Sequence, residues 1–163
     1  MKRKELNGKN LMLWVKDALG AAKVIALSKS CTLSVSAQKS DGNTKDDGNW
    51  SSGSIVGLSW NASNQSVDSA DQAVSNDMVY DELLAMMIAG TEIEVSVGIP
   101  SNASNDDVPA SGWLRPLTGY WKGSALITNV DRSGDKGSAA SVTVSFEGNG
   151  PLRKVTSGSG SGV

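Results

Sequence analysis

The sequence has no histidine and only one cysteine, Cys31, among its 163 residues. Without histidine, Ser-His-Asp catalysis, Cys-His catalysis and histidine-ligated metal sites are excluded. A single cysteine cannot form an internal disulfide, so the sequence gives no support for secretion into an oxidising compartment. We therefore expect a protein that is not an enzyme and that carries no cofactor or metal.

Basic charge and long apolar runs are also scarce. Lysine and arginine total 15 against 17 aspartate and glutamate residues, whereas domains built to bind nucleic acid usually carry a basic excess. The longest apolar run, from Leu84 to Ala89, is much shorter than the roughly 18 residues that cross a bilayer. The basic residues Lys2 to Lys4 are followed by polar residues rather than by the apolar stretch of a signal peptide. We expect no membrane partner and no nucleic-acid-binding surface as the main role.

Alternation of apolar and polar residues is the main pattern that is present. A period of two is typical of a strand with one buried face, and the clearest cases are residues 31–38 and 54–63. Further strands are expected at 11–15, 24–27, 91–99, 119–130 and 140–147, with a polar linker at 64–70 and a loop at 131–137. This pattern predicts one mainly β domain.

One segment has the period of a helix. Residues 75–89 place apolar side chains on a single face, and acids fall in the first turns, where the helix dipole favours them. The face consists of Val79, Leu83, Met86, Met87 and Gly90, and the acids are Asp77, Asp81 and Glu82. Gly90 is a typical helix stop. We expect this helix to pack on the sheet.

Two long polar loops each contain a single tryptophan. Residues 40–53 contain Trp50, and residues 100–117 contain Trp113. Tight hairpins need only two to five loop residues, and tryptophan is a frequent anchor of interfaces. We therefore predict that the 40–53 segment is loose in the free protein and becomes ordered against another chain, with Trp50 as the anchor.

Local motifs in this order resemble a known family. The segment from Ser40 to Trp50, with Lys45, Asp46, Gly48 and Trp50, follows the early hairpin. The segments Gly123–Thr128 and Val144–Leu152 form the last two strands and the turn after them. This arrangement is similar to that of the major tail tube proteins of long-tailed bacteriophages, and in particular of the TP901-1-type major tail protein family.

The resemblance implies a β-sandwich or partial barrel with one flanking helix, covering residues 1–152. Residues 153–163 would be a flexible tail rich in serine and glycine. Members of such a family form hexameric rings, in which strands of neighbouring subunits join into one continuous β-barrel around a lumen. Stacked rings would form the conduit for DNA ejection.

The resemblance also implies partners and a location. The partners are other copies of the chain and the tape measure, tail initiator and tail terminator proteins, while DNA passes through the lumen without specific binding. The protein would be found in the virion tail after assembly in the host cytoplasm.

Alternation shows which polar side chains would line such a lumen together. The candidates are Thr32, Ser34 and Ser36; Glu92, Glu94 and Ser96; and Thr143, Ser145 and Glu147, with Ser59 and Asn61 on the strand between. The opposite faces predict the core: Leu33, Val35, Leu58, Trp60, Ile93, Val95, Val142, Val144 and Phe146. Acidic side chains suit a lumen that must not hold phosphates.

Two other classes of protein fit the same strand pattern. One is the inner tube of a contractile injection system, and the other is a monomeric immunoglobulin-like binding or decoration module. The predicted helix counts against the immunoglobulin-like module. Electron microscopy separates the classes, because tube proteins form rings or tubes whereas a binding module stays a compact monomer.

Overall fold

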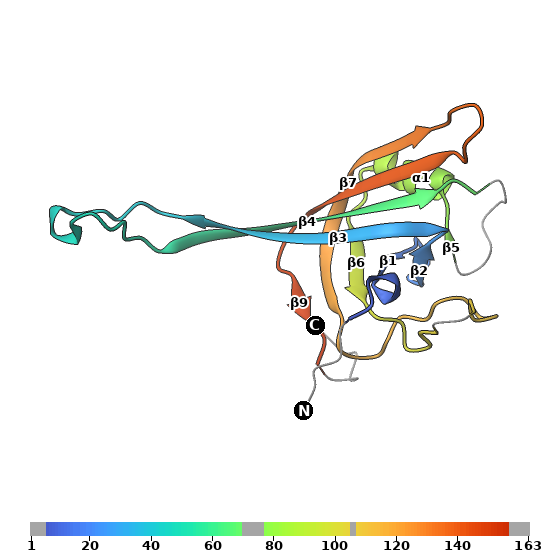
Figure 1. The fold of residues 1–163 in the computed structure, drawn as a ribbon, viewed down its shortest axis with the longest axis horizontal. Coiled ribbons are helices and arrows are strands. Elements are labelled where there is room, and N and C mark those ends of the chain that lie inside the picture. Colours follow the sequence, from blue (N-terminus) through green and yellow to red (C-terminus); the bar gives the residue numbers. More distant parts are fainter. Residues whose placement is uncertain (1–5, 70–76, 105–106, 157–163) are drawn as a thin grey trace.

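The fold, seen in a computed structural model that describes residues 6–69, 77–104 and 107–156, is one curved sheet with a helix (Figure 1). The nine strands of the described residues follow the order β3-β4-β8-β7-β6-β1-β2-β5, with β9 paired to β7. All pairs are antiparallel except β2 with β5. The prediction of a mainly β fold with one helix is confirmed.

All seven expected strands are present, and three of them are longer than predicted, one of which extends to residue 133 and takes in the start of the predicted loop at 131–137. The strands are β1 (Met12–Lys16), β2 (Ala22–Ile25), β3 (Ser28–Lys39), β4 (Ile55–Val67), β5 (Asp77–Met78), β6 (Ile93–Gly98), β7 (Trp121–Ser133), β8 (Ser141–Gly148) and β9 (Arg153–Lys154). Two short 3₁₀ helices, η1 (Gly8–Asn10) and η2 (Lys45–Asp47), and the helix α1 (Tyr80–Ala89) complete the described elements. The sequence did not predict β5 or β9.

The predicted linker at 64–70 is wrong for its first four residues, which belong to β4. Asn64 and Ser66 are polar but buried. The Ser28 hydroxyl donates to Asn64 Oδ1 over 2.7 Å, and the Ser66 hydroxyl donates to the Val142 carbonyl over 3.4 Å. These bonds let polar side chains occupy core positions, which the sequence pattern could not reveal.

The predicted helix start is also wrong, because α1 begins at Tyr80 rather than at residue 75. Asp77 and Met78 form the short strand β5, whose Met78 side chain is buried and whose Met78 carbonyl accepts a bond from the Ala26 amide over 3.0 Å. Residues 75 and 76 lie outside the described residues. The helix ends as predicted, with Gly90 in the left-handed conformation at φ 65°.

The core lies between two parts of the curved sheet. β7 joins them, because its residues 125–133 pair with β8 and its residues 121–125 pair with β6. Side chains of β4 and β8 pack there against those of β1 and β6 and against α1. Six of the predicted core residues are buried in this space: Trp60, Ile93, Val95, Val142, Val144 and Phe146.

Three predicted core residues of the β3–β4 hairpin are not buried. Val35 is 58% exposed, Leu58 is 74% exposed and Leu33 is half-buried. β8 pairs beside β4 only from Asn61 to Val67, so beyond Asn61 the hairpin extends past the body. The exposure of Val35 and Leu58 shows that no opposing layer covers them there. Alternation identified the correct face of these strands but could not show where the opposing layer ends.

Candidate interaction surfaces

The outer halves of β3 and β4 form a two-stranded arm that projects far from the body (Figure 1). The two strands pair from Ser28 opposite Ser66 to Lys39 opposite Ile55. Beyond Asn61 the two strands pair only with each other in the described sheet. The arm therefore presents both of its faces to the surroundings, including the apolar side chains of Val35 and Leu58.

The predicted 40–53 loop is the folded tip of this arm. Backbone bonds from Ser40 N to Ser54 O, 2.8 Å, and from Gly42 N to Ser52 O, 3.1 Å, continue the strand pairing into it. A Cβ on Gly53 would overlap the Ser40 carbonyl, so this close approach requires glycine. The segment is thus an extension of the hairpin rather than a separate loop between two short strands.

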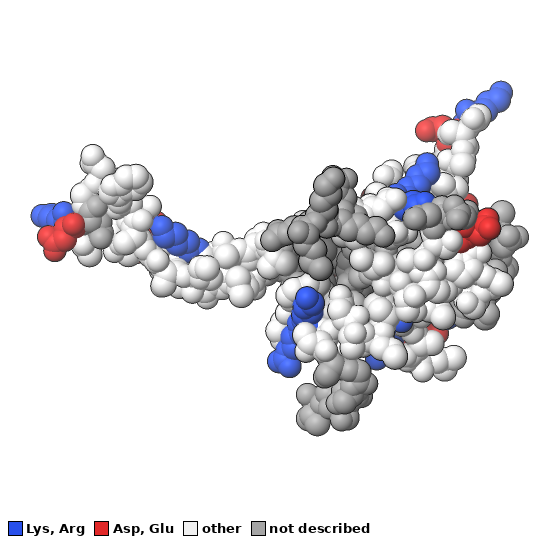
Figure 2. Space-filling model, turned by 60° about the horizontal axis from the view of Figure 1, so that its bottom comes forward, with Lys and Arg blue, Asp and Glu red and all other residues white. Residues whose placement is uncertain are grey.

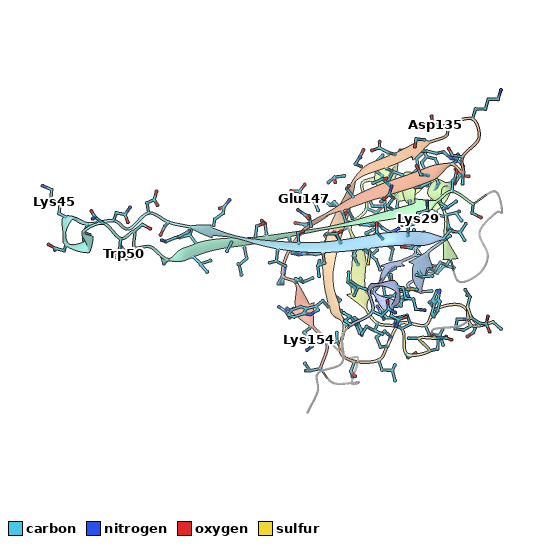
Figure 3. All side chains as sticks on the ribbon, in the orientation of Figure 1. Lys29, Lys45, Trp50, Asp135, Glu147 and Lys154 are labelled. Carbon is cyan, nitrogen blue, oxygen red and sulfur yellow. The ribbon has the colours of Figure 1, made fainter. Side chains whose placement is uncertain are left out.

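Side chains at the tip point into solvent. Trp50 is 85% exposed and Lys45 and Asp46 are exposed, while Gly48 supplies the turn with φ 62°. Figure 3 places Lys45 and Trp50 together at the end of the arm farthest from the body. Figure 2 shows charged side chains at this tip and a largely uncharged surface between the tip and the body.

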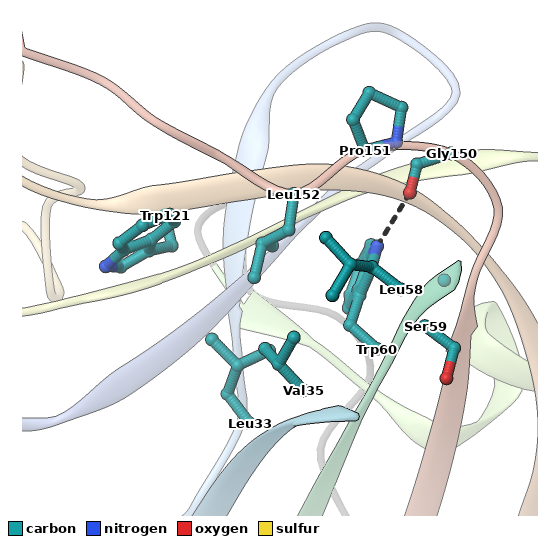
Figure 4. A pocket seen from close by; sticks show the side chains of 10 residues that line it. Leu33, Val35, Leu58, Ser59, Trp60, Trp121, Gly150, Pro151 and Leu152 are labelled. Carbon is teal, nitrogen blue, oxygen red and sulfur yellow. Dashed lines mark hydrogen bonds between the residues drawn. The ribbon is translucent and has the colours of Figure 1, made fainter. Parts of the chain in front are cut away.

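An apolar groove of about 710 Å³ lies where the arm leaves the body (Figure 4). Its floor includes Trp60, whose indole N–H donates to the Gly150 carbonyl over 3.0 Å. Residues of the arm, of the start of β7 and of the segment after β8 line its walls: Leu33, Val35, Leu58, Trp121, Pro151 and Leu152. Alternation predicted Leu33, Val35 and Leu58 as core, and the groove shows that the single chain leaves that part of the predicted core uncovered.

A polar surface covers the opposite face of β3, β4, β8 and β7. Strand register aligns Thr32 with Ser63 and Ser145, so two of the three predicted lumen sets lie on one face. Ser34 and Glu147 likewise share a row through Asn61. The face, named here the four-strand polar face, consists of Thr32, Ser34, Ser36, Ser59, Asn61, Ser63, Gln65, Thr143, Ser145, Glu147, Asn129, Asp131 and Ser133.

The four-strand polar face is hollowed and carries no basic side chain among those residues. A concavity of about 390 Å³ lies over Asn61, Ser145 and Glu147. Its serine, threonine and asparagine side chains are exposed or half-buried, as those of Thr32 and Ser34 are. The hydroxyl and amide groups of this surface can hydrogen-bond to water, and its carboxylates repel anions. None of the residues named for the face is a cation that could bind a phosphate.

The third predicted lumen set does not join this open surface. Ser96 is 1% exposed, and its hydroxyl accepts a bond from Arg115 over 3.1 Å, which contradicts a lumen position for that side chain. Glu94 is half-buried and forms ion pairs with Arg115, 3.1 Å, and Lys16, 3.4 Å. Glu92 is exposed but precedes the first residue of β6.

Comparison with known proteins identifies the family to which these surfaces belong. A family model described as phage tail tube protein matches residues 5–154. The chain belongs to the phage tail tube protein family. It is a structural protein of a phage tail.

Solved structures share the fold of this tail tube protein. A chain from the tail of an empty gene transfer agent particle refined with C6 symmetry superposes with a TM-score of 0.68 at 20% identity, covering 93% of this chain and 100% of that one. A chain of the SPP1 tail tube gives a TM-score of 0.66 at 11% identity, covering 94% and 82%. A chain of an anti-feeding prophage baseplate gives 0.62 at 12% identity, covering 96% and 98%. Comparison with curated proteins found no match.

The second tryptophan-bearing segment of this tail tube protein covers the outer face of β1 and β6. The Trp14 indole N–H donates to the Trp113 carbonyl over 3.3 Å, and Arg115 lies over the Tyr120 ring at 4.9 Å from its centroid. The Asn102 side chain bonds the Gly112 carbonyl over 2.8 Å. Trp113, which is half-buried, therefore belongs to a segment that is fastened to its own subunit.

Neither a candidate metal site nor a membrane-spanning helix is found among the described residues of this tail tube protein. The parts of the chain that the structure describes contain no group of three or more cysteine, aspartate or glutamate residues able to hold a metal ion. Burial raises the pKa of the Cys31 thiol, which donates to the Leu11 carbonyl over 3.3 Å. Among the described helices none has the length and apolar character to cross a membrane.

Proposed function

We propose that this chain is the major tail tube subunit and that it assembles into hexameric rings whose stacking forms the conduit for DNA. The observation that carries the proposal is the arm, which extends away from the core and exposes Val35, Leu58 and Trp50. Exposed apolar side chains on a long hairpin gain free energy when another chain covers them. The C6 symmetry of the similar gene transfer agent tail supports six copies in a ring.

In such a tube the four-strand polar face lines the lumen. The hydroxyl and amide side chains of this face, such as those of Thr32 and Ser145, hydrogen-bond to water. The carboxylates of Glu147 and Asp131 repel the phosphates of DNA. Without lysine or arginine on the face, DNA has no fixed cation to bind as it slides past. This assignment keeps Thr32, Ser34, Ser36, Thr143, Ser145 and Glu147 as lumen residues and leaves out Ser96.

The tip of the arm supplies the contact between subunits. Trp50 is the anchor. Lys45 and Asp46 place charges beside it, and Gly48 forms the turn that positions it. Covering one tryptophan contributes on the order of 2–4 kcal/mol before the cost of ordering is subtracted. Backbone pairing continues from Ser34 opposite Asn61 out to Gly42 opposite Ser52. At about 3.3 Å per strand residue this length spans on the order of 25 Å, so the tip can reach a subunit of the next ring.

The remaining assignments follow from this role. The subunit is non-enzymatic, belongs to the TP901-1-type major tail proteins, and meets the tape measure, initiator and terminator proteins of a virion tail assembled in the host cytoplasm. The motif from Lys45 to Trp50 supports the subfamily. The likeness to the anti-feeding prophage baseplate chain supports an injection-system tube as the alternative.

Electron microscopy of concentrated protein tests the proposal. We expect rings or tubes after addition of a tail initiator complex, because a free subunit can require nucleation. Particles that remain compact monomers by microscopy and light scattering, with and without the initiator, would overturn the tube assignment and favour a binding module.

A further inference from the structure

Two asparagines of the chain, Asn7 and Asn149, are followed by glycine, and every other asparagine is followed by a residue with a side chain. An Asn-Gly sequence is prone to spontaneous deamidation, because glycine has no side chain to hinder its backbone nitrogen from attacking the neighbouring carboxamide. In a folded protein the attack also requires that the two residues can rotate into contact. The structure gives the two Asn-Gly sequences very different surroundings.

Asn149 and Gly150 lie in the turn that connects β8 to β9. Both residues are exposed, and Gly150 has a φ of 111°, which residues with a Cβ rarely adopt. A Cβ added to Gly150 would have no atom within 4 Å, so the turn is open to water. Among the described residues, neither the Asn149 carboxamide nor the Gly150 amide has a hydrogen-bond partner. No contact in the described structure therefore holds the carboxamide away from the Gly150 nitrogen.

Asn7 is also exposed, but its side chain is held in place. The Asn7 carboxamide oxygen accepts a bond from the Lys9 amide over 3.2 Å and so caps η1, which begins at Gly8. The Asn10 amide donates to the Asn7 carbonyl over 3.0 Å. Rotation of the Gly8 nitrogen toward the Asn7 carboxamide carbon would break these bonds, so this site is protected.

β7 fixes the turn of Asn149 at both ends. The Asn149 amide donates to the Ser124 carbonyl over 2.8 Å, and farther along the chain Arg153 pairs with Lys122. Because both ends are tied to the same strand, the distance that the turn has to span is set by β7. A longer backbone in the turn would have to bulge between these two points.

The carbonyl in the middle of this turn is the acceptor for a buried indole. The Trp60 N–H donates to the Gly150 carbonyl over 3.0 Å, and Trp60 is only 5% exposed (Figure 4). An indole N–H that loses its acceptor in such a place is left without a bond, which is unfavourable. The position of the Gly150 carbonyl therefore affects how Trp60 is held at the root of the arm.

We propose that Asn149 is a site of spontaneous deamidation and that its conversion to isoaspartate releases the Trp60 indole from the Gly150 carbonyl. The deprotonated Gly150 nitrogen bonds to the Asn149 Cγ, and the side-chain nitrogen takes up protons from water and leaves as ammonia, which gives a cyclic imide. Water then opens the imide at one of its two carbonyl carbons and yields aspartate or isoaspartate. The net change is from amide and water to carboxylate and ammonium, without oxidation or reduction.

The two products differ in the length of the main chain. In isoaspartate the main chain runs through the former side chain and gains one carbon, which adds about 1.5 Å. Because β7 fixes both ends of the turn, the added carbon displaces the Gly150 carbonyl from Trp60. Aspartate carries the new charge on a main chain of the original length, so it leaves the Trp60 bond in place.

Peptide mapping of aged protein by mass spectrometry tests the modification. The full-length protein is kept in mildly alkaline buffer, in which more of the attacking nitrogen is deprotonated. We expect conversion at Asn149 to be several-fold faster than at Asn7 in the native protein, and the two rates to become similar in denaturant. Asn149→Gln is the control and should abolish conversion at that position, because glutamine would have to close a larger ring. Equal native rates, or a faster rate at Asn7, would overturn the proposal.

Hydrogen exchange of the assigned Trp60 indole proton, followed by NMR, tests the structural consequence. The isoaspartate form, separated by chromatography, should exchange this proton several-fold faster than the unmodified protein. Asn149→Asp is the matched control, because it adds the charge without the extra carbon, and its indole proton should exchange as slowly as that of the parent. Unchanged exchange in the isoaspartate form, or equally fast exchange in Asn149→Asp, would overturn the release of Trp60 by a lengthened backbone.

Discussion

Trp60 is the residue that joins the arm to the body. Its indole ring lies against the backbone of Gly123 and Gly148, where an added Cβ would overlap the ring. Its N–H is bonded to the Gly150 carbonyl. The two strand glycines therefore provide space for a large side chain, which is the usual reason for glycine in the interior of a strand.

Gly148→Ala is expected to destabilise the subunit by about 1–3 kcal/mol, because the new methyl group forces Trp60 out of its position. Chemical denaturation of the purified subunit measures the change. Gly134→Ala is the control, since the nearest atom to its added Cβ is at 3.7 Å and its backbone needs no left-handed conformation. Equal stability of the two variants would show that the ring is not held by Gly148.

Cys31 provides a second prediction at the residue scale. Burial raises the pKa of its thiol, so a smaller fraction is thiolate at any given pH in the folded protein than in the unfolded chain. Alkylation by iodoacetamide should therefore be slower in the native protein, and its rate should rise at higher pH than in denaturant. Identical pH profiles in the two states would contradict a half-buried thiol with a raised pKa.

The arm is the element that most clearly serves another chain. Val35, Leu58 and Trp50 are exposed in the isolated subunit, yet the pairing of the arm's backbone continues to the tip. Trp50→Ala should leave the melting temperature nearly unchanged and reduce tube growth strongly, because an exposed anchor contributes only in the assembly. Leu19→Ala should change neither property, and unfolding of the Trp50 variant would contradict an exposed tip.

The attachment of the 100–117 segment to the body depends largely on the side chain of Arg115. Arg115 bonds Glu94 and Ser96 and covers the Tyr120 ring. Arg115→Ala should cost on the order of 1–3 kcal/mol, because it leaves part-buried polar partners without their bond, and it should increase proteolysis within the segment. Lys122→Ala is a control for removal of a nearby basic side chain. Unchanged cleavage would show that other contacts hold the segment.

At the scale of the whole molecule, charge is distributed to suit a passive conduit. Glu147→Lys together with Asp131→Lys should permit tube assembly but retard DNA ejection, because cations on the four-strand polar face hold phosphates. Raising the salt concentration should restore part of the rate. Asp135→Lys, in the loop after β7, is the control and should have no effect. Normal ejection by the double variant would place that face away from the lumen.

Glu92 and Glu94 were the sequence-based candidates for this role, and we propose Glu147 and Asp131 in their place. Glu94 is already neutralised by Arg115 and Lys16, and Glu92 lies outside the strand. The alternation correctly places Glu94 and Ser96 on one face of β6. It does not show that Arg115, from the 100–117 segment, covers that face.

By itself the sequence determined the mainly β class, the positions of most strands, the end of the helix at Gly90 and the polar and apolar sides of each strand. Those properties depend on period and on local backbone preference, which neighbouring residues specify. The division into residues 1–152 and a flexible 153–163 tail stays a prediction, since residues 157–163 are outside the described part of the chain. Only the tertiary structure decided that Val35 and Leu58 lie beyond the covering layer, that Asn64 and Ser66 are core residues, and that Ser96 is sealed beneath Arg115. Those outcomes depend on which distant segment packs over each face, and no local pattern records such a contact.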